Sequence, residues 1–176
     1  MTTPPLTAAP QTGAAPVTIR RAGPADAATV HTLVLEIAAH EDSLQHVLVT
    51  RDGWARLLER DDVVVLLAER DGRALGYTSA VRRLHLWTGG DVLAVDDVFV
   101  RPGERSRGLG RRLLTAMAAF ADADGLQMTW GVEPDNARAQ AFYRGLGATL
   151  RHKVVAGWAP EAYRALLATD ATEAAR

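Results

Sequence analysis

The pattern of apolar and polar residues changes several times along the chain, and each change marks a new predicted element. Short apolar or alternating runs between turn residues are typical of strands, and apolar residues three or four apart are typical of helices. The strand pattern occurs at residues 17–20, 63–68, 74–81, 92–100, 126–132 and, as one bent strand or a strand pair, 148–158. The helix pattern begins at Pro24 and after Thr50, and it recurs at residues 109–123 and 137–146.

The order of these elements predicts an α/β (α+β) fold with a mixed central sheet of six to seven strands and about four helices. Asp71-Gly72 is a hairpin signal between two strand patterns, so antiparallel strands come first. Strand, helix, strand, helix and strand then follow, which is not the regular alternation of a dinucleotide-binding fold. We expect a single domain over residues 17–168, between an N-terminal tail (1–16) rich in Thr, Ala and Pro and a frayed C-terminal end (169–176).

Composition narrows the function classes. The chain has 176 residues and a formal net charge of -1, which argues against a dedicated nucleic-acid binder. It contains no cysteine, which excludes disulfides, thiolate metal sites and a cysteine nucleophile. The histidines lack metal-ligand spacing, so no metal site is expected. No signal-peptide pattern or long apolar run is present, and we expect a cytoplasmic protein that does not bind a membrane.

A glycine-containing basic turn lies between the predicted strand that ends at Val100 and the predicted helix that begins at Leu109. Free N–H groups at a helix N-terminus, together with the helix dipole, favour an anion there. A Walker loop is excluded because this segment has no lysine, and a Rossmann fingerprint is excluded because position 113 is Leu. The remaining pattern fits a cradled diphosphate; the alternative is a tight turn whose arginines form a solvated surface.

This turn resembles the acetyl-CoA motif of the GCN5-related N-acetyltransferases, the GNAT superfamily. A second family motif follows at Asn136 and at residues 141–148, which read Ala-Phe-Tyr-Arg-Gly-Leu-Gly-Ala. The resemblance extends from about Val17 to Leu167, and it implies the GNAT fold with acetyl-CoA as co-substrate. It also implies the cofactor-binding residues, which are Val98, Phe99, Val100, Arg105, Ser106, Arg107, Gly108, Leu109, Gly110, Arg111 and Asn136.

The family resemblance further implies direct transfer of an acetyl group to an amine. Tyr143 would protonate the departing thiolate, and Asp96 would accept the amine proton directly or through water. The strand around Asp96 resembles that of the diamine (spermidine/spermine-type) branch, in which a glutamate takes this place. Because side chains alternate along a strand, Asp96 and Asp97 are expected to point to opposite faces.

The acceptor is expected to be a small-molecule primary amine: a polyamine, a diamine, an amino-acid-like amine or an antibiotic amine. Glu41, Asp97, Trp87 and Arg151 are weaker candidates for binding it. Two alternatives stay open: a protein or peptide N-acetyltransferase, and a non-catalytic acyl-CoA-binding module. A homodimer through the apolar residues between Val154 and Trp158 is a further expectation.

Overall fold

A computed structural model of the protein describes residues 15–174. The chain divides after Gly131 into two compact units, which are described separately below. The first 14 residues, most of the predicted N-terminal tail, lie outside the described residues. The expectation of one domain over residues 17–168 stays a prediction.

The first unit is built on a five-stranded sheet with the strand order β1-β2-β3-β4-β5. Each of the first four strands pairs antiparallel with the next, whereas β4 and β5 are parallel. The strands are β1 (Thr18–Arg21), β2 (Val63–Arg70), β3 (Arg73–His85), β4 (Gly90–Val100) and β5 (Gln127–Thr129). The predicted mixed sheet is therefore confirmed, with fewer strands than expected.

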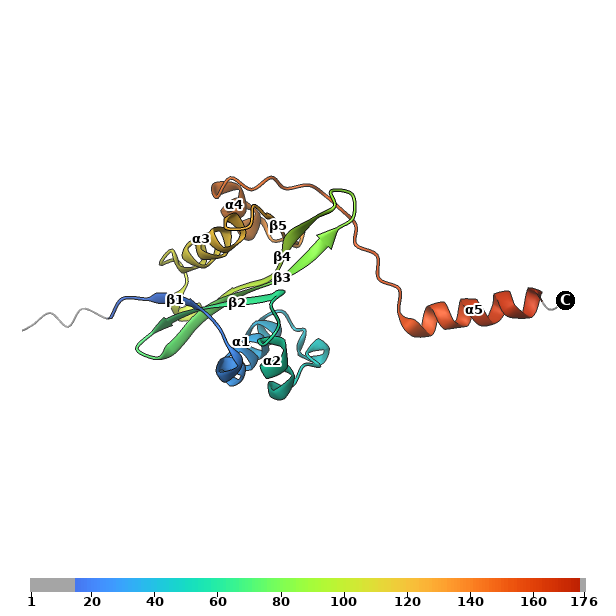
Figure 1. Ribbon diagram of the computed structural model, residues 1–176, viewed down its shortest axis with the longest axis horizontal. Coiled ribbons are helices and arrows are strands. Elements are labelled where there is room, and N and C mark those ends of the chain that lie inside the picture. Colours follow the sequence, from blue (N-terminus) through green and yellow to red (C-terminus); the bar gives the residue numbers. More distant parts are fainter. Residues whose placement is uncertain (1–14, 175–176) are drawn as a thin grey trace, which may run out of the picture. The chain divides into compact units, whose positions relative to one another are not determined.

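Helices cover both faces of this sheet. α1 (Ala27–His40) and α2 (Arg51–Leu57) lie on one face, and α3 (Leu109–Asp122) lies on the other (Figure 1). Alternating residues of the central strands point to opposite faces of the sheet and belong to two separate hydrophobic cores. Leu93 and Val95 pack with α3, whereas Tyr77 and Phe99 pack with α1 and α2. The sheet therefore has two buried faces, which explains the nearly continuous apolar runs of its central strands.

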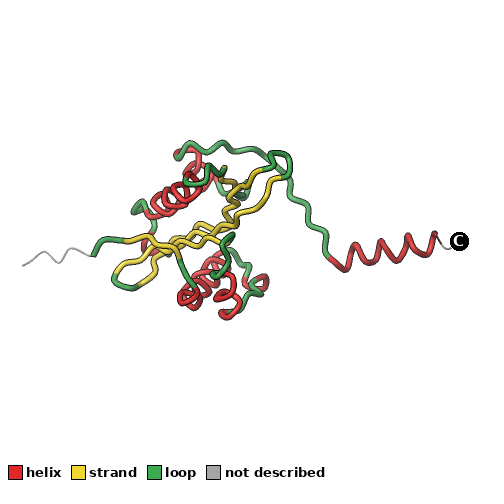
Figure 2. The backbone as a smooth tube through the Cα atoms, viewed as in Figure 1, coloured by secondary structure: helices red, strands yellow, loops and turns green. Residues whose placement is uncertain are grey.

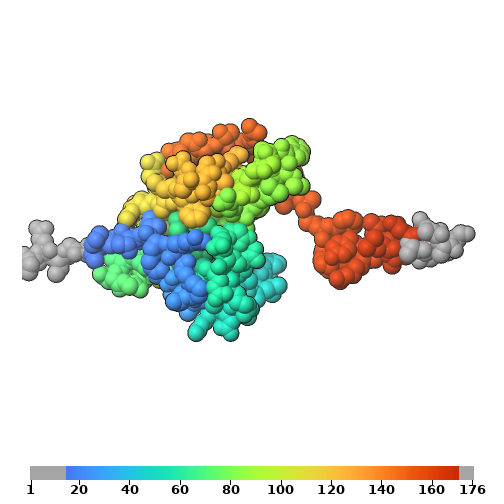
Figure 3. Space-filling view, viewed as in Figure 1, coloured from blue at the N-terminus to red at the C-terminus, as the bar shows by residue number. Residues whose placement is uncertain are grey.

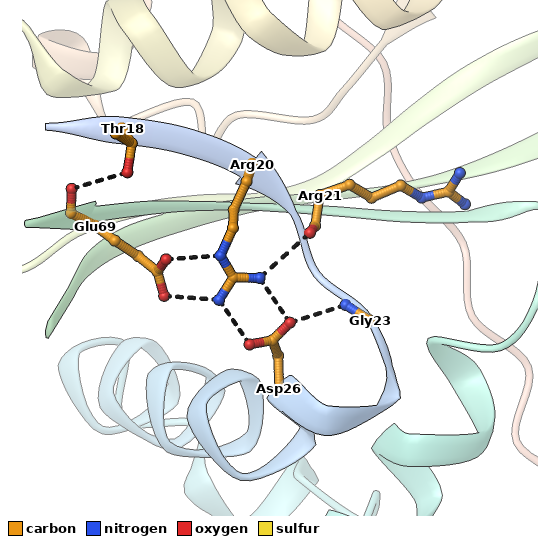
Figure 4. Close-up of polar contacts among 6 residues, drawn as sticks. All are labelled: Thr18, Arg20, Arg21, Gly23, Asp26 and Glu69. Carbon is orange, nitrogen blue, oxygen red and sulfur yellow. Dashed lines mark hydrogen bonds and ion pairs between the residues drawn. The ribbon is translucent and has the colours of Figure 1, made fainter. Parts of the chain in front are cut away.

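A partly exposed ion cluster at the edge of the sheet connects β1 to the rest of the first unit (Figure 4). The Arg20 guanidinium makes paired hydrogen bonds to the carboxylates of Glu69 on β2 and Asp26, at distances of 2.7–2.9 Å. Asp26 belongs to the short 3-10 helix η1 (Pro24–Asp26) that leads into α1, and it also accepts the N–H of Gly23. One arginine thus links β1, β2 and the start of α1.

Two further short 3-10 helices and the β3–β4 hairpin complete the first unit. The 3-10 helices are η2 (Leu44–His46) and η3 (Pro102–Glu104). The tip of the hairpin projects from the unit (Figure 3), and Trp87 at this tip is 96% exposed.

The second unit contains α4 (Ala137–Gly145) and α5 (Pro160–Ala174). The strand predicted at residues 148–158 is wrong, because this segment has no regular structure (Figure 2). A strand exists only through its hydrogen-bonded partner, and apolar residues alone do not supply one. Here Val154 is 93% exposed. α5 was not predicted and extends to Ala174, into the segment expected to be frayed.

One glycine fixes how closely β3 and β4 approach. Gly76 pairs with Val100, and a Cβ atom at Gly76 would collide with the backbone of Phe99 and Val100. We expect Gly76→Ala to destabilise the protein by about 1–3 kcal/mol, as overpacking does. Thermal unfolding should show a lower melting temperature, whereas Gly90→Ala, where a Cβ meets nothing within 4 Å, is the matched control. Equal melting temperatures for the two variants would contradict the prediction.

Candidate active site

The central feature of the candidate site is a β-bulge in β4. Ser79 pairs with Asp97, but the next residue, Ala80, pairs with Val95, so Asp96 is an extra residue without a partner on β3. Val95 and Val98, on either side of the acidic pair, both pack with the α3 core. Asp96 and Asp97 therefore both point away from α3, toward the α1 and α2 side.

The expectation that Asp96 and Asp97 point to opposite faces is thus wrong. Strict alternation holds only where the two strands advance one residue at a time, and a bulge adds one residue to one strand. The consequence is that two neighbouring carboxylates share one side of the sheet.

Asp97 is held by three neighbouring hydroxyl groups of β3. The hydroxyls of Tyr77 and Ser79 each donate to Asp97 Oδ2 at 2.9 Å. Ser79 Oγ also accepts the Asp97 N–H at 3.2 Å, and the Thr78 hydroxyl donates to the Asp97 carbonyl oxygen at 2.8 Å. Asp97 is half-buried, whereas Asp96 is exposed. These contacts to Asp97 were not predicted from the sequence, although three consecutive hydroxyl residues in a largely apolar strand were a visible signal.

Negative charge accumulates around this bulge. Partial desolvation, followed by the neighbouring charge of Asp97, raises the pKa of Asp96 above its ordinary value. Burial raises the pKa of the Tyr77 phenol, and Asp97, Glu41 and Asp96 add to this effect through their charges. Three of the predicted acidic site residues, from β4 and from the end of α1, therefore act on one buried tyrosine.

The far half of β4 offers an unoccupied edge. β5 pairs with β4 only at Val92, Leu93 and Ala94, and no other strand among residues 15–174 continues that ladder. The edge from Val95 to Val100 can therefore accept an extended ligand as an additional strand. This edge includes Val98, Phe99 and Val100, the strand residues for which the family resemblance implies contacts with the cofactor.

The basic turn ends at a helix N-terminus, as predicted. Gly108 is the residue just before α3, and its φ of +75° is in the left-handed region that favours glycine. The first helical hydrogen bond runs from the Arg112 N–H to the Gly108 carbonyl, so the N–H groups of Leu109 and Gly110 have no acceptor within the helix. A Cβ at Gly108 would meet nothing within 4 Å, which leaves room for a ligand.

The arginines of this turn do not all point to one place. Arg105 donates to the Val100 carbonyl at 2.9 Å and lies 3.4 Å from His40 Nε2. Arg107 pairs with Glu104 at 3.4 Å, and Arg112 donates to the Val17 carbonyl at 2.7 Å. Backbone N–H groups, rather than a cluster of free guanidinium groups, are thus the main anion donors that this geometry offers.

Two predicted site residues belong to the second unit: Asn136 directly precedes α4, and Tyr143 lies within it. Asn136 caps α4, because its side chain accepts the Ala139 N–H at 3.0 Å. Burial raises the pKa of Tyr143, whose ring packs against that of Phe142 with centroids 5.3 Å apart. Tyr143 therefore holds its proton at neutral pH, as a general acid must. Its catalytic role and the cofactor contact of Asn136 stay predictions.

The two remaining candidates for acceptor binding are Trp87 and Arg151. Trp87 lies in the turn before Gly90, and six residues of extended strand, roughly 20 Å, separate Gly90 from Asp96. The structure therefore does not bring Trp87 to the bulge. Arg151 is exposed in the segment between α4 and α5, and its role in acceptor binding stays a prediction.

Comparison with known proteins identifies the family. The profile of the Acetyltransferase (GNAT) family matches residues 30–148, which include the bulge, the basic turn and α4. The chain belongs to this family. GNAT acetyltransferases use acetyl-CoA, so the predicted family, fold and co-substrate are confirmed at the level of the family. The resemblance to the diamine branch stays a prediction.

Individual GNAT relatives include curated proteins. An uncharacterised N-acetyltransferase of Bacillus subtilis is 31% identical over 91 residues, which is 51% of this chain and 61% of the relative. An aminoglycoside N(6')-acetyltransferase of Salmonella typhimurium is 27% identical over 103 residues, which is 56% of this chain and 71% of that protein.

Solved structures show the same GNAT fold. An aminoglycoside acetyltransferase from an uncultured soil sample, in complex with trehalose, has a TM-score of 0.72 at 18% identity and covers 81% of this chain and 95% of its own. An aminoglycoside N-acetyltransferase in complex with CoA has a TM-score of 0.71 at 20% identity, and the match covers 86% of this chain and 99% of that chain. At these identities the likeness establishes the fold.

The described residues contain neither a membrane-spanning helix nor a metal-binding cluster. No helix in this part of the chain is both long and apolar enough to cross a membrane. Nor do residues 15–174 contain a group of three His, Asp or Glu side chains placed to hold a metal ion.

Proposed function

We propose that this GNAT protein moves an acetyl group from acetyl-CoA to a primary amine of a small molecule that carries additional positive charge. The observation that carries this proposal is the bulge, which turns Asp96 and Asp97 to one side of the sheet, where Glu41 also acts on Tyr77. Carboxylates gathered on one side attract a cationic acceptor. Polyamines and aminoglycosides both carry several ammonium groups, and two curated relatives bear the name aminoglycoside N(6')-acetyltransferase.

The proposed chemistry needs no nucleophile from the protein, which agrees with a chain that has no cysteine. Asp96 takes a proton from the acceptor ammonium, directly or through a water molecule, and frees the nitrogen lone pair. The new C–N bond then forms at the acetyl carbonyl while the C–S bond breaks. Tyr143 gives its proton to the departing thiolate. The nitrogen loses its second proton to water as the amide forms, and exchange with water returns a proton to Tyr143 and removes the one held by Asp96. Positioning of the two substrates and proton transfer are the contributions required of the protein.

The residues of the first unit suit the donor substrate. The open edge from Val95 to Val100 can pair with the amides of a pantetheine arm, and the N–H groups of Leu109 and Gly110 can bind its diphosphate. The left-handed Gly108 lets a phosphate approach the backbone closely.

The test is a panel of amines incubated with acetyl-CoA, with mass-spectrometric detection of the acetylated product. Polycationic amines should be acetylated with a higher kcat/KM than neutral monoamines of similar size. Tight CoA binding without acetylation of any amine would contradict the proposal. Acetylation of peptides alone would favour the protein-acetyltransferase alternative.

Asp96→Asn should change the preference among acceptors. Because the variant removes a negative charge beside the acceptor, we expect kcat/KM to fall roughly tenfold more for polycationic amines than for neutral ones. The comparison is made at one pH and one ionic strength, since salt screens exposed charges. Equal losses on both classes would show that Asp96 does not select for charge.

A further inference from the structure

The polar contacts beneath the bulge are concentrated on one residue. Three consecutive β3 residues, Tyr77, Thr78 and Ser79, place their hydroxyl groups on Asp97. Tyr77 and Thr78 have no exposed surface, and Ser79 is 6% exposed. Burying a hydroxyl is costly unless it is hydrogen-bonded, so each of these groups depends on Asp97 for its partner.

Two of the three hydroxyl groups donate hydrogen bonds to the Asp97 carboxylate itself. The hydroxyls of Tyr77 and Ser79 converge on the same oxygen, Asp97 Oδ2, and Ser79 Oγ in turn accepts the Asp97 N–H. Ser79 and Asp97 form the last regular pair before the register shifts. The arrangement therefore fixes both the side chain and the backbone of Asp97 next to the extra residue.

We propose that Tyr77 and Ser79 are positioning residues: they hold the Asp97 carboxylate against β3 and leave Asp96 as the carboxylate that meets the acceptor amine. We name these two side chains the hydroxyl clamp. The inference rests on the proposed acetyl transfer and deepens it, because it divides the work of the acidic pair. Asp97 supplies a fixed negative charge, and Asp96 exchanges the proton.

The charges that face this pair come from three elements. β4 supplies Asp96 and Asp97, β3 supplies the Tyr77 phenol, and Glu41 directly follows the last residue of α1. Glu36, also on α1, forms a two-bond ion pair with Arg101 at 2.6–2.7 Å. The fixed charge of Asp97 is thus the charge that acts most directly on Asp96, and like charges favour retention of a proton.

The test compares Tyr77→Phe and Ser79→Ala with Thr78→Val. All three variants remove one buried hydroxyl bonded to Asp97, but Thr78 binds the backbone carbonyl and not the carboxylate. Both clamp variants should lower kcat about tenfold with less than a threefold change in the acceptor KM. Thr78→Val should lower the unfolding midpoint to a similar degree and keep kcat within twofold.

The pH profile gives a second readout, which a merely structural role does not move. Asp96 must be deprotonated to act, so activity rises with pH through the pKa of Asp96. In Tyr77→Phe or Ser79→Ala, the Asp97 carboxylate loses one of its hydrogen bonds to β3. We expect it to move away from Asp96, so that its negative charge affects Asp96 less. The pKa of Asp96 then falls, and the acid limb of kcat/KM moves down by about half a pH unit. Thr78→Val should leave the limb in place.

Several outcomes would overturn the inference. Equal effects of all three variants on kcat and on the acid limb would show that the hydroxyls only support the sheet. Loss of all turnover in Asp97→Asn, with turnover retained in Asp96→Asn, would reverse the assigned roles.

Carbon-13 NMR of the aspartate carboxyl groups, recorded without substrate, separates this inference from the proposed function. The clamp predicts that Tyr77→Phe lowers the pKa of Asp96 in the free protein, whether or not any amine is acetylated. A wild-type protein without turnover would contradict the proposed function alone. An unchanged Asp96 titration in both clamp variants would contradict the clamp alone.

Discussion

Tyr143→Phe is expected to lower kcat by roughly 10²-fold or more, the usual contribution of one general acid. The substitution removes only the phenol oxygen and keeps the aromatic ring that packs against Phe142. Burial raises the pKa of Tyr143, so the group carries its proton throughout the neutral range and can give it to a thiolate. Without this acid the thiolate must leave unprotonated, which slows breakage of the C–S bond.

The measurement combines steady-state turnover with calorimetric titration of CoA. We expect the dissociation constant of CoA to change less than threefold, because the proposed diphosphate and pantetheine contacts are made by the first unit. Tyr163→Phe is the matched control, since Tyr163 also lies in the second unit and also packs against an aromatic ring, that of Trp158. A fully active Tyr143→Phe protein would refute the assignment of the acid.

The elements of the first unit could largely be predicted from periodicity. The predicted helix 109–123 and the observed α3 (Leu109–Asp122) differ by one residue, because apolar spacing and the glycine turn mark both the helix face and its start. The left-handed conformation of Gly108 follows from the same turn. These features are local, so they are encoded in consecutive residues.

The bulge could not be predicted in the same way. Whether Asp96 faces its partner strand depends on how many residues β3 supplies opposite it, and a count along β4 alone contains no such information. The strand prediction for residues 148–158 was wrong for a related reason. Apolar residues favour a strand, but they do not show whether a partner strand is available. By contrast, Pro160 followed by Glu161 was a recognisable helix start, and α5 could have been predicted from it.

The difference between local features and pairing across the sheet also explains which site residues could be predicted. The residues of the basic turn and the Asn136 and Tyr143 motif are contiguous or regularly spaced, so their resemblance to a family could be recognised in the sequence. Tyr77 and Ser79 acquire their role only through Asp97, 18 or more residues away along the chain. Pairing across a sheet is the step that the sequence pattern left open.

Gly108→Trp is expected to weaken CoA binding at least about 100-fold. The backbone at Gly108 is left-handed, so any side chain there is strained by about 1–2 kcal/mol, but its Cβ would enter open space and not the core. The protein should therefore still fold. The indole would occupy the space above the N–H groups of Leu109 and Gly110, where the diphosphate is proposed to bind.

Gly125→Trp is the control that separates strain from blockage. Gly125 follows the other end of α3, has a φ of +64°, and likewise has nothing within 4 Å of its Cβ position. If both variants unfold at similar temperatures and only Gly108→Trp loses CoA, the loss arises from the blocked turn. Titration with 3'-phosphoadenosine 5'-diphosphate and with pantetheine then resolves the two halves of the ligand. Because the open β4 edge lies outside the turn, pantetheine should bind Gly108→Trp as it binds the wild type. Unchanged CoA affinity would place the diphosphate away from α3, even though a left-handed glycine and unpaired N–H groups make its N-terminus a suitable anion site.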